Sequence, residues 1–176
     1  VDTLFGKGYQ LTWASALSQP GQFACKERVE LVGPKRSIKN IIVLGPERPE
    51  TQAEISATDA VAAGIAAPVR MSGDIAGTPG AKLVGPAGEL TIPQGVIVAG
   101  RHIHITPQDA ARFGVRDGQA VDVRTAGGRA VTFHNVMVRV SDKFATYMHI
   151  DYDEANACGF QKGLQGVILP TGGGIS

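Results

Sequence analysis

The sequence predicts a mainly β fold, made of two related small β-barrels with a few short helices. Two observations carry this prediction. First, 23 glycine and 10 proline residues interrupt the chain at short intervals, and the runs between them are short and rich in valine and isoleucine, as in proteins with many short strands. Second, one stretch of the chain recurs later at a constant spacing.

The expected strands follow one another along the chain. They are Arg28–Val32, Ile38–Leu44, Ala81–Val84, Gly95–Ala99, Ala120–Val123, Ala130–Val140 and Ala145–Ile150. The sequence Leu-Val-Gly-Pro occurs at Leu31–Pro34 and at Leu83–Pro86, and it indicates a strand that ends in a tight turn. Such a series favours a barrel or a sandwich over alternating strands and helices.

Helices are expected to be few and short. The clearest begins after Thr106, a good N-cap, has Pro107 at its first position and ends at Gly114. Ser56–Gly64 and Asp153–Gly159 have the same form, with a polar start and a final glycine.

An internal repeat relates Asn40–Ile65 to Asn135–Phe160 at a constant offset of 95 residues. The matching pairs include Asn40 with Asn135, Val43 with Val138, Thr51 with Thr146, Ile55 with Ile150, Ala60 with Ala155 and Gly64 with Gly159. Both copies read as strand, strand and short helix. We therefore expect one barrel over residues 1–99, a second over 100–169, and a tail at 170–176.

Composition and charge argue against several classes of protein. The 176 residues fit one domain or two small ones, and 43% hydrophobic residues suffice for a packed core. A net charge of +1 with scattered basic residues argues against a nucleic-acid partner. No apolar run reaches the roughly 18 residues of a membrane span, and no secretion signal is visible at Val1. Cys25 and Cys158 are expected to be buried free thiols.

His102 and His104 are candidate metal ligands. They lie two residues apart in an apolar run, so in a strand both side chains leave the same face, about 6.5–7 Å apart. This suits two imidazoles on one metal ion, and His149 is the natural third ligand from another strand. Spacing alone leaves open two surface histidines and one core histidine. His134 has no such pattern and is assigned no role.

Glu54 takes the position of His149 in the first copy of the repeat. A carboxylate between apolar neighbours is costly unless it is paired or metal-bound, although an ordinary half-exposed strand residue is the alternative. Arg48 lies on a proline-stiffened loop that leads to Glu54. Its guanidinium has the planar donor fork suited to phosphate, and a solvated loop arginine is the alternative. Arg70–Gly80 reads either as a ligand-binding backbone or as a plain surface loop.

These segments together resemble the PduL-type phosphotransacylases (phosphate propanoyltransferases) found with bacterial microcompartments. The matching stretches, in family order, are Leu17–Phe23, Leu31–Lys35, Glu54–Ala60, Arg70–Gly73, Gly77–Gly80, Gly95–Ala99, Arg101–His104 and Met148–Ala157. The resemblance implies two β-barrels with a two-zinc site. It also implies an acyltransferase that interconverts short-chain acyl-CoA (propanoyl-CoA or acetyl-CoA) plus phosphate with acyl phosphate plus CoA.

By the same resemblance, His102, His104 and His149 look like the ligands of one zinc, and Glu54 looks like a ligand of the other. The remaining ligands of the second zinc match a family segment, Asn-Arg-His-x-His, that is expected upstream of Val1. Two zinc ions are therefore expected in the intact protein.

Arg48 matches the family's phosphate-binding arginine and is the expected catalytic residue. Ser72, Gly73 and Gly100 are expected to contact the substrates, acyl-CoA and phosphate. The expected location is the microcompartment lumen or the cytoplasm, with shell proteins, lumen enzymes or further copies of the chain as candidate partners.

Two alternatives to the acyltransferase stay open. A cupin-like metal oxygenase or isomerase shares the His-x-His strand, but it requires a glutamate a few residues later, where Thr106–Asp109 opens a helix instead. The other is a non-catalytic barrel that scaffolds a microcompartment. Because no Ser-His-Asp set is evident, direct acyl transfer is preferred to a covalent acyl-enzyme.

Overall fold

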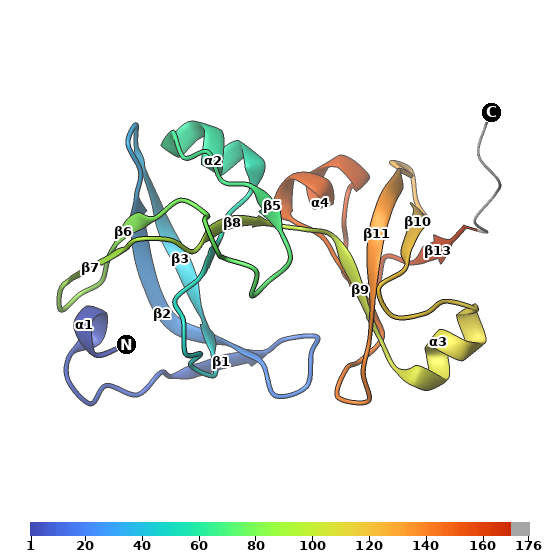
Figure 1. Cartoon of the computed structure of the whole chain (residues 1–176), viewed down its shortest axis with the longest axis horizontal. Coiled ribbons are helices and arrows are strands. Elements are labelled where there is room, and N and C mark those ends of the chain that lie inside the picture. The colour runs from blue at the N-terminus through green and yellow to red at the C-terminus, as the bar shows by residue number, and fades with distance from the viewer. Residues whose placement is uncertain (170–176) are drawn as a thin grey trace. The chain divides into compact units, whose positions relative to one another are not determined.

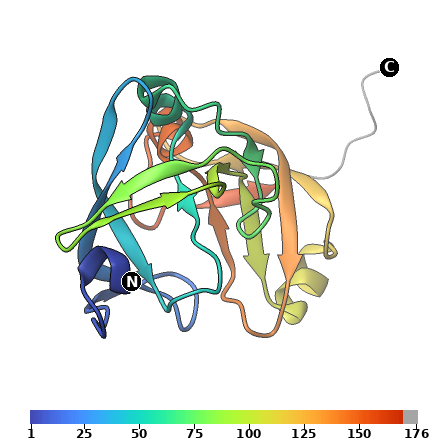
Figure 2. The same ribbon diagram turned by 60° about the vertical axis from the view of Figure 1, so that its left-hand side comes forward.

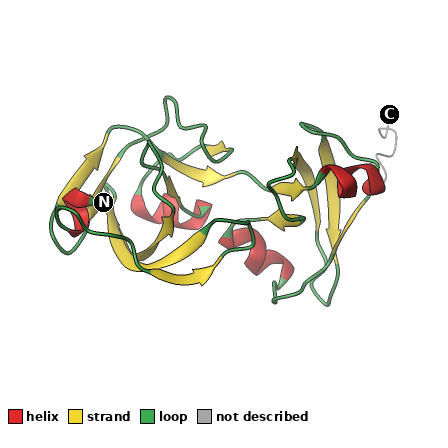
Figure 3. Cartoon of the chain, turned by 90° about the horizontal axis from the view of Figure 1, so that it is seen from below, coloured by secondary structure: helices red, strands yellow, loops and turns green. Residues whose placement is uncertain are grey.

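The computed structural model of the chain describes residues 1–169. It is mainly β, with four short helices in that range (Figures 1 and 3). The chain divides into two compact units, one of Val1–Ala99 and one that begins at Gly100. The prediction of a mainly β chain with few helices is therefore confirmed, while the predicted tail at 170–176 lies outside the described residues.

The first unit is built around two long antiparallel strands. Its strands are β1 (Trp13–Ala16), β2 (Phe23–Val32), β3 (Ser37–Gly45), β4 (Ala53–Glu54), β5 (Val69–Arg70), β6 (Ala81–Val84), β7 (Glu89–Ile92) and β8 (Val96–Ala99). Its helices are α1 (Asp2–Phe5) and α2 (Ala57–Ala63). Strand β2 pairs with β1, β3 and β6 in one curled sheet, which β7 extends. Strands β4 and β5 pair in parallel with β8.

Alternation along β2 creates the core of this unit. Successive side chains of a strand point to opposite faces, and Cys25, Val29 and Leu31 are buried on one face of β2. Helix α1 lies against the β6–β7 hairpin, where the backbone N–H of Ala87 donates to the carbonyl of Leu4 at 2.9 Å (Figure 2).

Glu27 is a charged residue on that buried face of β2. It accepts hydrogen bonds from the hydroxyl of Tyr9 at 2.8 Å and from the backbone N–H of Thr12 at 3.0 and 3.1 Å. Burial alone would raise the pKa of Glu27, but the hydrogen bonds from Thr12 and Tyr9 outweigh burial and lower the pKa to about 2. The carboxylate thereby fixes the segment before β1 onto β2.

Glu27→Gln is expected to lower the free energy of unfolding by about 1–3 kcal/mol at pH 7, because charge-assisted hydrogen bonds are lost. A pKa held below its ordinary 4.5 means that the stabilisation is complete above that value and is lost as the pH falls toward 2. Urea unfolding should therefore show a smaller difference in the free energy of unfolding between the parent and Glu27→Gln at pH 3 than at pH 7. Glu30→Gln, on the same strand, is the control. An equal difference at both pH values would contradict this account.

Over residues 100–169, the second unit is a single mixed sheet with two helices. Its strands are β9 (His102–Ile105), β10 (Ala120–Thr125), β11 (Thr132–Val140), β12 (Tyr147–His149) and β13 (Gly166–Ile168), and its helices are α3 (Pro107–Phe113) and α4 (Tyr152–Cys158). The strand order is β12-β9-β11-β10-β13. Strand β9 runs parallel to β11 and antiparallel to β12, and its isoleucines lie in the core of the unit.

The helix boundaries follow the capping residues of the sequence. Thr106 caps α3 by accepting a hydrogen bond from the backbone N–H of Asp109 at 3.1 Å, and Gly114 ends α3 in the left-handed conformation. Gly64 and Gly159 end α2 and α4 in the same conformation, which glycine adopts without a steric cost.

The repeat of 95 residues is present in the folded chain. Strand β3 spans Ser37–Gly45 and β11 spans Thr132–Val140, and α2 and α4 begin and end at the same offset. Asn40 and Asn135 both have left-handed backbones, with φ of 60° and 56°. The strand orders within residues 1–169 describe curled sheets, and the two closed barrels stay a prediction. None of the described helices is long and apolar enough to span a membrane.

Candidate functional site

Strands β9 and β12 bring three histidines together in the second unit. His102 and His104 leave one face of β9, and His149, the last residue of β12, is the backbone partner of His102. The ring centroids of the three lie 4.6, 4.9 and 4.8 Å apart. One potential ligand nitrogen from each ring lies within 4.8 Å of the others. We call these three residues the histidine cluster.

His104 shows most clearly that the histidine cluster is suited to a ligand. Both ring nitrogens of His104 are buried and have no hydrogen-bond partner among residues 1–169. Each such group costs about 1–3 kcal/mol if it stays unsatisfied. The ring of Phe144 stacks on His104 with centroids 4.0 Å apart, which keeps water from one face of the imidazole.

The electrostatics of the histidine cluster favour neutral imidazoles. Burial, with further contributions from His102, His149 and Arg139, lowers the pKa of His104 to about 3. Burial, His102 and Arg139 lower the pKa of His149 to about 4. At pH 7 both rings are neutral, which is the form that binds a metal ion.

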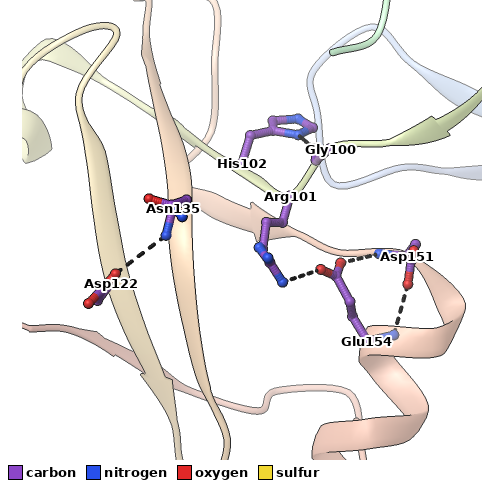
Figure 4. Close-up of polar contacts among 7 residues, drawn as sticks. All are labelled: Gly100, Arg101, His102, Asp122, Asn135, Asp151 and Glu154. Carbon is purple, nitrogen blue, oxygen red and sulfur yellow. Dashed lines mark hydrogen bonds and ion pairs between the residues drawn. The ribbon is translucent and has the colours of Figure 1, made fainter. Parts of the chain in front are cut away.

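The backbone of Gly100 orients the first of these histidines. Its carbonyl oxygen lies 2.8 Å from Nδ1 of His102 (Figure 4). A carbonyl can only accept a hydrogen bond, so Nδ1 carries a proton, and Nε2 is the nitrogen that can offer a lone pair to a metal ion. Gly100 was expected to contact substrate, and the structure shows it holding a histidine.

The histidine cluster fits a divalent metal ion such as zinc. It offers three imidazoles, and the buried nitrogens of His104 have no other partner in the part of the chain that the structure describes. Zinc sites with three protein ligands leave a fourth position for substrate. Within residues 1–169 this is the one group of three potential metal ligands. Glu54 is not part of such a group.

The first unit gathers the other predicted residues into a second group. Arg48 donates from Nη1 to the hydroxyl of Ser72 at 3.2 Å. The side-chain amide of Gln52 joins the rest: its nitrogen donates to Ser72 at 3.0 Å and to Glu54, and its oxygen accepts from the backbone N–H of Gly73 at 2.7 Å. We call these five residues the Arg48 cluster. Arg48, Glu54, Ser72 and Gly73 were named from the sequence; Gln52 was not.

Gln52 could have been found from its spacing. It lies two residues before Glu54, so in an extended segment both side chains leave the same face. An amide on the same face as a candidate ligand is a natural partner for it.

A cavity of about 270 Å³ opens beside the Arg48 cluster. Arg48, Gln52 and Glu54 contribute polar atoms to its lining. Most of the remaining wall is apolar and comes from α1, the segment before β1, β2 and β3, with Leu4, Phe5, Leu11, Val29, Ile41, Ile42, Val43 and Leu44. Charged groups and an apolar wall in one cavity suit a ligand that has both characters.

His134 stays outside both groups. Its Nδ1 lies 2.8 Å from a carboxylate oxygen of Asp122 on the exposed face of β10 and β11, and both side chains are accessible to solvent. His134 and Asp122 therefore form a surface pair.

Comparison with known proteins identifies the family. The family model described as phosphate propanoyltransferase matches residues 1–161. A phosphate propanoyltransferase of Listeria monocytogenes is 57% identical over 169 residues, which is 96% of this chain and 79% of that protein. Those of Clostridioides difficile and Enterococcus faecalis are 56% and 55% identical, each over 96% of this chain and 81% and 80% of their own lengths. The chain therefore belongs to the phosphate propanoyltransferase family, and it is an acyltransferase.

Proposed function

We propose that this chain is a metal-dependent phosphate acyltransferase. It interconverts propanoyl-CoA or acetyl-CoA plus phosphate with acyl phosphate plus CoA. The relatives' shared name supports phosphate and an acyl group as substrates. The single observation that carries the metal dependence is the histidine cluster, in which both buried ring nitrogens of His104 have no hydrogen-bond partner among residues 1–169.

The histidine cluster holds a zinc ion in this proposal. Zinc, when bound, supplies a Lewis acid that polarises a carbonyl and favours a thiolate. His102, His104 and His149 provide the ligands. The carbonyl of Gly100 orients His102, and Phe144 shields His104 from water.

A second zinc, with Glu54 as one ligand, completes the expected pair. Glu54 is the repeat counterpart of His149, at the same offset that relates β3 to β11. In the second unit, β9 pairs with Met137–Val140 of β11. The counterpart of that stretch in β3 is Ile42–Gly45, of which Ile42, Val43 and Leu44 line the cavity beside Glu54. An extended His-x-His segment of the family would fit there as β9 fits beside β11.

Arg48 binds and aims the phosphate. Its guanidinium makes one hydrogen bond, to Ser72, and no ion pair with any described carboxylate, so the rest of the donor fork can face an anion. A phosphate oxygen held there attacks the thioester carbonyl carbon directly, the new C–O bond forms and the C–S bond breaks, and CoA leaves as its thiolate. Ser72 and Gly73 line the place where the substrate phosphate would lie.

The two alternatives are less favoured. A cupin-like site requires a glutamate soon after its histidines, whereas α3 begins at Pro107, directly after β9. A scaffold barrel gives no reason for the buried nitrogens of His104, which have no partner among residues 1–169. We further propose two related β-barrels, a location in the microcompartment lumen or the cytoplasm, and contacts with shell proteins, lumen enzymes or further copies of the chain.

The direct test is release of free CoA thiol from propanoyl-CoA and from acetyl-CoA, with and without phosphate, by the zinc-loaded protein. We expect thiol release that depends on phosphate and that stops when a chelator removes the metal. Release without phosphate would indicate a thioesterase. Full activity in the metal-free protein would reject the metal dependence.

A further inference from the structure

One carboxylate in the second unit accepts hydrogen bonds on both of its oxygens, from two residues that lie close in the chain to His102 and His149. Glu154, on α4, accepts a hydrogen bond at Oε1 from Nη1 of Arg101 at 2.8 Å. Its Oε2 accepts from the backbone N–H of Asp151 at 3.0 Å. Figure 4 shows Arg101 and Asp151 reaching the same carboxylate.

These two bonds tie β9 to the end of β12. Arg101 directly precedes His102, and Asp151 follows His149 by two residues. His102 and His149 are backbone partners at the last position of the short β9–β12 pairing. The carboxylate therefore joins the two strands at the point where the pairing ends and where two of the three candidate ligands lie.

Arg101 is held from a second side as well. Its guanidinium carbon lies 5.7 Å from the centre of the Phe133 ring on β11, a distance at which a cation is attracted to an aromatic face. The side chain of Glu154 is 18% exposed and that of Arg101 is 36% exposed. A charge-assisted bond in such partial burial is stronger and better oriented than an ion pair on the open surface.

Capping of α4 alone does not account for this arrangement. In the first unit, Ser56 caps α2 through the backbone N–H of Asp59, the counterpart of Glu154. In the second unit, Asp151 and Glu154 form a reciprocal capping box, and the second oxygen of Glu154 remains for Arg101. The additional hydrogen bond joins Glu154 to Arg101, the residue that directly precedes the strand with His102.

We propose that Arg101 and Glu154 are positioning residues, whose ion pair fixes the separation and orientation of the His102 and His149 imidazoles and thereby sets the metal affinity of the histidine cluster. This inference rests on the proposed metal site. Neither residue contacts the metal; the ion pair acts through the two backbones. Outer partners of ligating histidines typically change metal affinity by about 10–100-fold.

The test uses Co²⁺ as a spectroscopic probe on the full chain. Arg101→Met and Glu154→Gln should weaken Co²⁺ binding by about 10–100-fold, measured by competition with a chelator. They should also change the visible absorption of bound Co²⁺, because the arrangement of the ligands changes. Arg101→Lys keeps the charge and should recover part of the affinity. Lys82→Met breaks an exposed ion pair with Glu89 in the first unit (3.0 Å) and is the matched control.

Unfolding of the metal-free variants separates positioning from stability. Parent-like affinity and spectrum in Arg101→Met and Glu154→Gln would overturn the positioning role while leaving the metal site intact. An unchanged spectrum, with an affinity loss that only follows reduced stability, would also overturn it. If the parent protein binds no Co²⁺ at its histidines, the proposed metal site fails, and the inference fails with it.

Discussion

His104→Ala should empty the histidine cluster of zinc and lower phosphate-dependent thiol release by a factor on the order of 10³ or more, since metal catalysis of this kind contributes several kcal/mol. Elemental analysis gives the zinc per chain, and a thiol-release assay gives the activity. The two buried ring nitrogens of His104 have no partner among the described residues. Removing them relieves an unsatisfied buried group, which offsets the loss of ring packing. The metal-free variant should therefore be about as stable as the metal-free parent.

The control for this variant is His134→Ala. His134 is exposed and pairs with Asp122 on the surface of the same unit, so both zinc content and activity should stay at the parent level. Zinc content unchanged in His104→Ala would show that the histidine cluster is not the metal site.

Arg48→Lys should raise the KM for phosphate by about 10–100-fold and leave the KM for acyl-CoA nearly unchanged. Lysine keeps the positive charge but loses the planar fork that holds two phosphate oxygens at once. A change in KM of about 10–100-fold corresponds to about 1.4–2.8 kcal/mol of phosphate-binding free energy. Steady-state kinetics with each substrate varied in turn distinguishes phosphate binding from acyl-CoA binding.

Arg116→Lys is the matched control for Arg48→Lys, because Arg116 is an exposed loop arginine in the second unit. Equal effects of Arg48→Lys on both substrates, or none, would make Arg48 a structural residue that supports the Ser72 loop.

Local signals made much of the fold predictable. Helix α3 follows from Thr106, Pro107 and Gly114, whose capping chemistry acts within a few residues. The elements that could not be predicted depend on distant partners. Helix α1 has only four residues and is completed by the contact between Leu4 and Ala87. Strand β13 lies in a segment for which the sequence predicts no strand, and it forms by pairing with β10.

The candidate site likewise contains residues that local spacing predicts and residues that only the tertiary fold brings together. His102 and His104 were predictable because a period of two residues places them on one face of a strand. Gln52 bonds to a loop that lies about twenty residues further on, and Arg101 bonds to Glu154 across a separation of 53 residues. Sequence spacing carries no signal over such separations, because only the tertiary fold brings these atoms together.

The equal spacing of the two copies indicates that they arose by duplication of a gene segment, and it predicts where the chain tolerates inserted residues. From β3 to the end of α2, and from β11 to the end of α4, the copies have the same length, as expected of a duplicated gene segment in which no insertion or deletion has survived. One residue added before Glu54 or His149 would turn that side chain to the opposite face of its strand. After the helices the copies diverge, into β5 and β6 after α2 and into β13 after α4. Engineered insertions should therefore be tolerated better directly after Gly64 and Gly159, before the next strand begins, than within either copy.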